Sequence, residues 1–416
     1  MLRSYSGNIP KLYIVKLAKW FMLTMPIIVL FYQENGLNMQ DVFTLKAFYS
    51  VAVVIMEIPS GYFADVWGRR KTLILGSILG CLGFVVYSFS SDFWGFLLAE
   101  LVLGIGSSFI SGADSALLYD SLLQEKKEKT YLKQESRMMS VGNFAEALAG
   151  IAGGSLALIS LRTPFIFQCF IAFMAIPASF FLLEPQSSES KSKTGFVHIL
   201  KIVRYSLWEN LQLRLNILYS SIFGCATLSL AWFIQPYLKQ FDMEVSTIGV
   251  IWTLLNLTVG FTALFAYRIE SKLGKIGTSL LILVGLSSGF ILSGVMNTQL
   301  GIICLFYFYV IRGIATPILK DYINRLTASD IRATVLSLRN FIIRILFAII
   351  APFLGWYTDR FSIGAALIFA GIIIFVLGGF TLFFIRKTEV KGREVERSKS
   401  LKVQGLKSRK VESQRV

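Results

Sequence analysis

Charged side chains stand inside long apolar segments of this chain, where an ionisable group must either serve a function or find a partner. At membrane depth such a group costs about 2.5–3.5 kcal/mol even on lenient insertion scales. The candidates are Glu100, Asp114, Glu146, Arg312 and Arg344. A buried carboxylate without a strong partner can hold a proton near neutral pH, as a proton carrier must. We rank Glu146 first and Glu100 second for that role, and ion pairing that only fixes helix packing is the open alternative.

Aromatic and hydrogen-bonding side chains gather where two of the apolar segments end, in FYQENG and WFIQPYLKQF. They are Tyr32, Gln33, Glu34, Trp232, Gln235 and Tyr237. Tryptophan and tyrosine at such a depth commonly anchor a helix at the membrane interface. Contact with a substrate at the outer mouth of a cavity is the alternative interpretation.

The stretch EIPSGYFADVWGRRK concentrates charge at the end of another apolar segment. A carboxylate such as Asp65 can accept hydrogen bonds from the free N–H groups at a helix N-terminus and meets the positive end of the helix dipole. Gly61 and Gly68 permit close backbone approach and a tight turn. The cations Arg69 and Arg70 either pair with an acid or only fix the topology, and both interpretations remain open.

The apolar segments determine the fold class. Of 416 residues, 55% are hydrophobic and only 16% are charged, against about a quarter charged in soluble domains. Charged ends divide the chain into twelve segments, each long enough to cross about 30 Å of hydrocarbon as a helix. We therefore predict an all-α membrane protein with helices over 13–33, 42–65, 72–91, 94–123, 137–160, 163–183, 212–238, 245–268, 277–296, 300–322, 333–358 and 362–385.

Positive charges alternate between the loops. Loops that follow even-numbered segments are rich in Lys and Arg, as at 69–71 and 126–129, whereas the loops between them hold almost none. Because basic loops stay in the cytoplasm, we expect both termini there, in a multi-pass protein of the bacterial inner membrane. The basic tail, 387–416, is expected to be disordered, and its cations suit anionic lipid.

A polar connector divides the chain into two halves. We place a six-helix bundle at 1–183, a cytoplasmic linker with an amphipathic helix at 184–211 and a second six-helix bundle at 212–386. The letters SVGNF at 140–144 recur as SLRNF at 337–341, at matching places in the two halves. Two pseudo-symmetric bundles of six spans form an architecture in which the bundles rock around a central site.

The letters GYFADVWGRR at 61–70 resemble the loop signature of the major facilitator superfamily, Gly-x-Leu-Ala-Asp-Arg-x-Gly-Arg-Lys/Arg, which lies between spans two and three. Phe63 replaces the leucine and Val66 the arginine. With twelve spans, the whole chain resembles a bacterial drug-efflux-like member of that family. The resemblance implies a latch, in which Asp65 caps the eleventh span and Arg69 or Arg70 meets Asp120 at the end of the fourth.

The same resemblance places spans two and eleven in contact, so that Glu57 and Arg339 would form a buried pair across the halves. It also places Glu100, Glu146, Arg312 and Arg344 around a central site. Asp114 lies too deep in the cytoplasmic half of the fourth span to be a loop charge, and we expect it to line the inner vestibule. One departure concerns Glu100, which stands with Gly104 where proton-linked members carry Arg-x-x-x-Gly. Proton antiport is therefore a hypothesis here.

These features predict a secondary active transporter of a small organic solute, without catalytic residues, metal site or cofactor. Proton-coupled efflux of drug-like compounds is the leading interpretation. An importer of a nutrient or anionic metabolite is the alternative, and a non-transporting membrane sensor or scaffold is a remote one. The P-loop pattern of ATP-driven proteins does not occur. The expected partners are the solute, a proton and the lipid bilayer, not nucleic acid despite a net charge of +16, and the expected state is a monomer.

Overall fold

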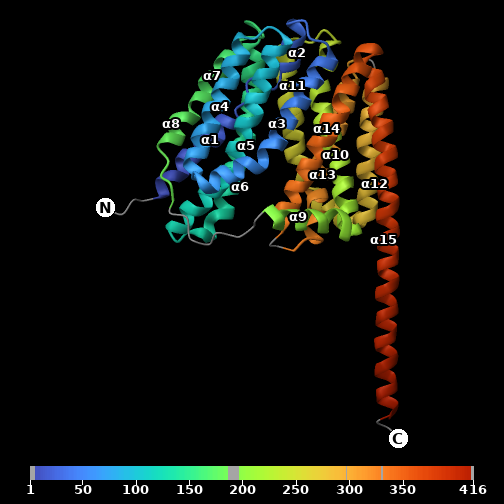
Figure 1. Ribbon diagram of the computed structural model, residues 1–416. Coiled ribbons are helices and arrows are strands. Elements are labelled where there is room, and N and C mark those ends of the chain that lie inside the picture. The colour runs from blue at the N-terminus through green and yellow to red at the C-terminus, as the bar shows by residue number, and fades with distance from the viewer. Residues whose placement is uncertain (1–4, 186–195, 297, 329–330, 414–416) are drawn as a thin grey trace.

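The computed structural model describes residues 5–185, 196–296, 298–328 and 331–413, and within them the chain forms helices and turns but no strand (Figure 1). The first half contains the turns η1 (Tyr5–Gly7) and η2 (Glu128–Thr130) and the helices α1 (Asn8–Trp20), α2 (Ile28–Glu34), α3 (Met39–Val66), α4 (Arg69–Phe89), α5 (Phe93–Gln124), α6 (Tyr131–Leu156), α7 (Thr163–Phe173) and α8 (Ala175–Phe180). After α9 (Phe196–Arg204) and the π-helical turn η3 (Tyr205–Glu209) come α10 (Leu211–Lys239), α11 (Val245–Ala263), α12 (Ala266–Val295), α13 (Gly301–Arg325), α14 (Arg332–Arg360) and α15 (Ile363–Ser413).

In the described part of the chain, ten helices are long and apolar enough to cross a membrane. Two further expected spans complete the predicted twelve. One is α1 with α2, which together form an interrupted first span, and the other is α6, which carries Lys133, Arg137 and Glu146. The predicted all-α membrane fold is confirmed.

Two expected spans are broken by proline. The first, expected to run unbroken over 13–33, is interrupted at residues 21–27, because Pro26 lacks an N–H and disfavours helical backbone at Met25. The sixth is divided at Met174 into α7 and α8, since the ring of Pro177 clashes with the carbonyl four residues earlier.

Helix starts follow local capping chemistry. The Asn38 side chain accepts a hydrogen bond from the backbone N–H of Asp41 at 2.8 Å, and the Asp41 carboxylate accepts one from Asn38 N–H at 3.2 Å. The side chains of Asp92 and Asn210 cap α5 and α10 with one bond each, from the N–H groups of Gly95 and Leu213. Gly68 has φ +97°, a backbone conformation that glycine adopts without strain, and this permits the abrupt turn from α3 to α4.

The two halves contact each other mainly through two helix pairs, α3 with α14 and α6 with α11, and α2 makes a smaller contact with α10. Gly150 and Gly154 of α6 lie against Gly249 of α11, where an added Cβ would stand 2.6 Å from the Gly150 carbonyl oxygen. Such small residues let backbones approach closely. The halves lie together toward the upper end of Figure 1 and diverge toward its lower end.

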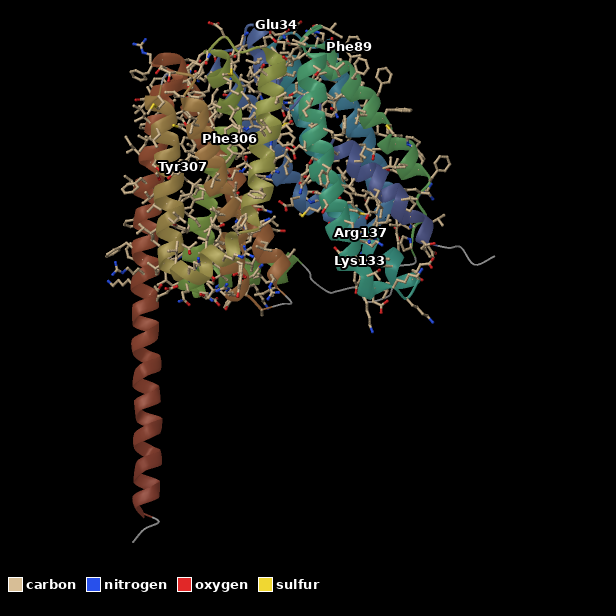
Figure 2. The ribbon with its side chains drawn as sticks, turned by 180° about the vertical axis from the view of Figure 1, so that it is seen from behind. Glu34, Phe89, Lys133, Arg137, Phe306 and Tyr307 are labelled. Atoms are coloured by element: carbon tan, nitrogen blue, oxygen red, sulfur yellow. The ribbon has the colours of Figure 1, made fainter. Side chains whose placement is uncertain are left out.

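Figure 2 places Lys133 and Arg137 at the lower end of the molecule and Glu34 and Phe89 at the upper end. We call these the basic end and the opposite end. Near the basic end, α9 packs apolar side chains on the second half, through Ile202 against Ile323 and Val335.

The C-terminal tail differs from expectation. Residues 387–413, expected to be disordered, continue α15 as a helix that extends beyond the basic end (Figure 1). No proline follows Pro352, and the tail is rich in Lys, Arg and Glu, which favour helix. At the root of this extension Glu389 pairs with Lys275 at 2.7 Å.

Candidate functional site

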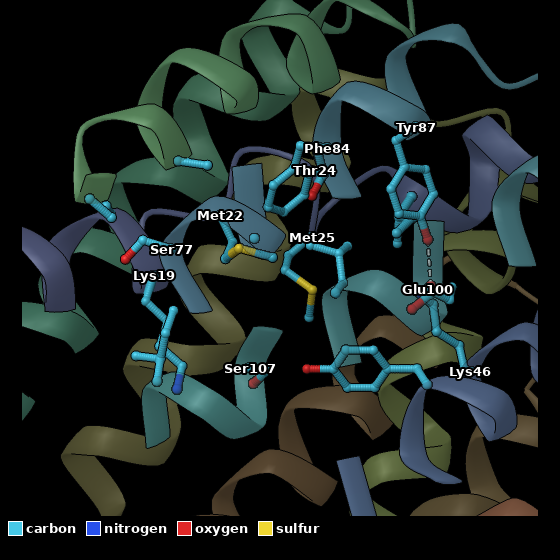
Figure 3. A pocket seen from close by; sticks show the side chains of 18 of the residues that line it. Lys19, Met22, Thr24, Met25, Lys46, Ser77, Phe84, Tyr87, Glu100 and Ser107 are labelled. Atoms are coloured by element: carbon cyan, nitrogen blue, oxygen red, sulfur yellow. Dashed lines mark hydrogen bonds and ion pairs between the residues drawn. The ribbon is translucent and has the colours of Figure 1, made fainter. Parts of the chain in front are cut away.

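A cavity of about 260 Å³ lies mainly in the first half, among α1, α3, α4 and α5 (Figure 3). Most of the cavity wall is apolar. Trp232 of α10 is the lining residue that comes from the second half. Its charged lining residues are Lys19, Lys46 and Glu100.

Glu100 is the centre of a buried polar cluster at one side of the cavity. Its Oε1 accepts hydrogen bonds from the hydroxyls of Tyr32 at 2.7 Å and Tyr87 at 2.5 Å, and forms an ion pair with Lys46. The residue is 2% exposed and Lys46 is 5% exposed. A carboxylate buried so deeply is stable only when it is paired and hydrogen-bonded, and four elements supply these groups.

Lys46 also contacts the second half. Its ammonium lies 4.5 Å from the centroid of the Trp232 ring and 5.3 Å from that of Tyr32. A cation over an aromatic face is attracted by the ring quadrupole, more strongly when water is excluded. The acid–base pair of the first half therefore touches α10 directly.

The interrupted first span is completed by the second half. Gln235 of α10 accepts a hydrogen bond from the N–H of Val29 and donates one to the carbonyl of Met25, both at 2.7 Å. Backbone groups freed by a helix break at membrane depth require such partners. This contact joins the halves on the opposite-end side of the cavity.

A carboxylate of the second half caps a helix of the first. Asp359, near the end of α14, accepts hydrogen bonds from the N–H groups of Met39 at 2.9 Å and Gln40 at 2.7 Å, at the start of α3. Thr253 of α11 likewise donates to the Ala147 carbonyl of α6 at 2.9 Å. These cross-half bonds hold the opposite end closed.

At the basic end, Arg69 forms an ion pair with Asp120 and donates to the carbonyl of Ala116 at 2.6 Å. The carboxylate of Glu184 accepts from the N–H groups of Arg69 and Arg70, each at 2.8 Å, and so caps α4. These contacts all lie within the first half. The Asp65 side chain lies outside the described part, and Gly61, expected at a close approach, has no described atom within 4 Å of an added Cβ.

The expected pair of Glu57 with Arg339 is replaced by other contacts. Arg339 donates from Nε to Ser220 Oγ at 2.5 Å and from Nη1 to Asn340, within the second half. The opposite charge that acts on Glu57 is Arg344. Five residues of helix rotate a side chain by about 140°, so Arg339 faces α10 while Arg344 faces α3.

The other predicted charges are dispersed rather than gathered around one site. Glu146 is opposed across the halves by Arg312, whose guanidinium lies 4.9 Å from the Tyr309 ring centroid. Asp114 pairs with Lys16 at 3.1 Å. Of the predicted set, only Glu100 lines the cavity.

The predicted mouth residues are mostly internal. Tyr32, Trp232, Gln235 and Tyr237 are buried, and the Tyr237 hydroxyl donates to the carbonyls of Ser293 and Met296. The other two differ in exposure: Gln33 is partly buried, with its amide 3.6 Å from the sulfur of Met39, and Glu34 is exposed.

Sequence reasoning missed Lys19, Lys46, Glu184 and Asp359. Lys19 and Lys46 are single cations near the ends of expected spans, where they resemble ordinary boundary residues. A signal was available for Lys46, since a lysine inside an apolar span requires a counter-ion, and the nearest acids of its own helix, Asp41 and Glu57, lie five and eleven positions away.

Two six-span bundles joined at one end, with a largely apolar cavity in the first bundle that α10 of the second also lines, are typical of secondary transporters that work by alternating access. The chain belongs to the Major Facilitator Superfamily, whose family model matches residues 17–351. The resemblance of the loop at 61–70 is thereby confirmed, and the protein is a transporter rather than an enzyme.

Known relatives span most of the chain. The uncharacterized MFS-type transporter YxaM of Bacillus subtilis is 24% identical over 325 residues, which cover 76% of this chain and 80% of that protein. Multidrug resistance protein 2 of the same organism is 23% identical over 385 residues, covering 88% and 91%. Among solved structures, the nucleoside transporter NupG aligns with a TM-score of 0.75 at 11% identity, covering 93% and 99%, which shows the fold alone.

Proposed function

We propose that this transporter exports small amphiphilic, drug-like solutes by alternating access, driven by the proton gradient. The observation that carries the proposal is the apolar cavity with a buried acid–base pair in its wall. An apolar wall with few placed polar groups suits amphiphilic solutes. Similarity to a multidrug resistance protein over most of the chain also supports export.

Glu100 is the proposed proton carrier, in preference to Glu146, because it lines the cavity whereas Glu146 does not, and we propose that it takes up a proton when Lys46 moves away from it. Protonation would remove the charge that Lys46 faces. The neutral acid would also donate a hydrogen bond where the carboxylate accepted several, so the Tyr32 and Tyr87 hydroxyls would reorient. Since Lys46 contacts Trp232, this local change reaches the second half.

The basic end is proposed to face the cytoplasm, following the excess of Lys and Arg there. The conformation described is then closed toward the outside. Arg69 and Asp120, with Asp65, would act as the latch of the cytoplasmic side, and the protein would work as a monomer in the bacterial inner membrane.

Import of a nutrient or anionic metabolite is the second candidate. The observation that favours it is Lys19, a cation in the cavity wall. The two candidates differ in the direction of coupled flux rather than in architecture.

Purified protein in sealed proteoliposomes, with an imposed pH gradient and a panel of fluorescent amphiphiles, tests the proposal. We expect solute to accumulate in the compartment from which protons leave, and collapse of the gradient to abolish accumulation. Accumulation in the compartment that protons enter supports the importer. Flux that is independent of the gradient contradicts proton coupling.

A further inference from the structure

The unpartnered polar atoms in the cavity wall are hydrogen-bond donors. Thr24 Oγ1 and Trp232 Nε1 are buried without a hydrogen-bond partner in the described part of the chain. Thr24 is fully buried and Trp232 is 8% exposed, and both line the cavity. An indole N–H can only donate, and a hydroxyl can donate when an acceptor arrives. Both atoms are themselves shielded by protein in this conformation, so a ligand acceptor would pair with them only after the wall shifts.

The charges of the cavity wall favour an anionic ligand. Lys46 pairs with Glu100, whereas no hydrogen bond or ion pair is described for the ammonium of Lys19. Two lysines and one glutamate give the wall one net positive charge. An unpaired cation in a site of low dielectric is unfavourable, and an anionic group relieves it.

The charged groups around Lys19 leave its own charge uncompensated. Asp114, Lys16 and Arg344 act on it electrostatically. Asp114 lies 3.1 Å from Lys16, and Glu135 also lies against Lys16, at 3.7 Å. Both acids are thus directed to Lys16, one turn before Lys19 on α1.

The apolar part of the wall lies between these polar groups. In Figure 3, Lys19 and the pair of Lys46 with Glu100 stand on opposite sides of the cavity, with Met22 and Met25 between them. Methionine side chains adapt to ligands of different shape. A ligand whose charged group meets Lys19 would lay its apolar body across this surface.

We infer that the cavity takes an amphiphile with one anionic head group, which Lys19 binds while the apolar body lies against Met22 and Met25. The inference rests on the proposed function only in taking the cavity as the solute site. Carboxylate and phosphate head groups share the required chemistry, a negative charge with several acceptor oxygens.

Matched ligands test the inference directly. Pyrenebutyrate, pyrenebutyl phosphate, pyrenebutanol and pyrenebutyltrimethylammonium have the same apolar body and differ in the head group. Binding to the full-length protein in nanodiscs of zwitterionic lipid is followed by energy transfer from tryptophan. We expect one or both anions to bind about 10- to 100-fold more tightly than the cation, as for a charge-assisted hydrogen bond. The two anionic probes separate a carboxylate preference from a phosphate preference.

Variants of α1 assign the effect to one side chain. K19Q is expected to remove the preference for the anions while changing pyrenebutanol affinity less than about twofold, and K19R to retain it. K11Q is the matched control, because Lys11 lies on the same helix, outside the cavity, and donates to the Phe181 carbonyl. Tighter binding of the cation, or an unchanged preference in K19Q, overturns the inference. Anion-selective binding without gradient-driven flux upholds it and contradicts the proposed function alone.

Discussion

At the scale of single residues, the pair of Lys46 with Glu100 combines a structural and a functional requirement. Each partner is buried, so neither charge is stable without the other. Two tyrosine hydroxyls and a tryptophan ring complete the environment. The same groups that stabilise the pair are those that a proton on Glu100 would disturb.

E100Q is expected to lower stability markedly, because removing one partner of a buried pair costs about 3–5 kcal/mol. The double variant E100Q with K46M is expected to recover much of this loss, since no uncompensated charge remains. Thermal unfolding of both in nanodiscs provides the measurement. Equal unfolding temperatures for the single and double variants would show that the pair carries no coupling energy. Gradient-driven transport should be lost in both.

D120N tests the latch at the basic end. It removes the charge that Arg69 faces, and we expect flux to fall about tenfold with folding intact, equivalent to about 1.4 kcal/mol. D321N is the control, because Asp321 pairs with Arg325 at 2.6 Å on the exposed surface. Exposed pairs contribute about 0–1 kcal/mol, so its flux should change little. Similar losses in both variants would contradict a specific latch.

The limits of sequence reasoning are clearest at this scale. Glu100 could be named because one acid in an apolar run is conspicuous. Its partner could not be named from the sequence, because Lys46 is 54 positions away and only the packing of α3 against α5 brings the two residues together. The assignment of Arg339 to Glu57 failed for a related reason, since span contact does not specify which face each arginine presents.

At the scale of elements, hydropathy predicts where helices lie but not where they break. The boundaries of α4, α10 and α13 lie within a few residues of expectation. Pro26 and Pro177 interrupt two spans that average hydropathy treats as continuous. The break at 21–27 is stabilised by side chains distant in the sequence, Gln168 at Leu23 and Gln235 at Met25 and Val29, which local sequence cannot reveal.

Glycine packing between α6 and α11 gives a prediction at this scale. G249A places a Cβ 2.6 Å from the Gly150 carbonyl oxygen, so the helices must separate and the closed opposite end becomes less favourable. G260A, on the same helix, is the control, because no described atom lies within 4 Å of its added Cβ. Spin-label distances between the halves at the opposite end should lengthen in G249A alone. Unchanged distances would exclude this contact as a determinant of closure.

At the scale of the whole molecule, the fold was predictable because its main signals are global. The number of spans, the alternating charge of the loops and the repeat between the halves each depend on many residues. A wrong interpretation of one residue therefore does not change the predicted fold. The cavity was not predictable, because its wall combines residues from several helices. The tail was misjudged because a charged composition favours helix as readily as disorder when prolines are absent.

Reporter fusions test the orientation of the molecule. Green fluorescent protein fused after residue 416 should be fluorescent, and alkaline phosphatase fused there should be inactive, since the basic end is proposed to face the cytoplasm. Alkaline phosphatase inserted after Gly36, at the opposite end, should be active. The reverse pattern would invert the topology and with it the direction of transport.

The interrupted first span also has a consequence for biogenesis. The backbone N–H of Val29 bonds to Gln235, which is synthesised 206 residues later. Until α10 enters the membrane, the nascent first bundle carries backbone groups at the break that hydrocarbon cannot solvate. The first half synthesised alone should therefore be a substrate for membrane proteases, and the two halves made as separate chains should protect each other by assembling.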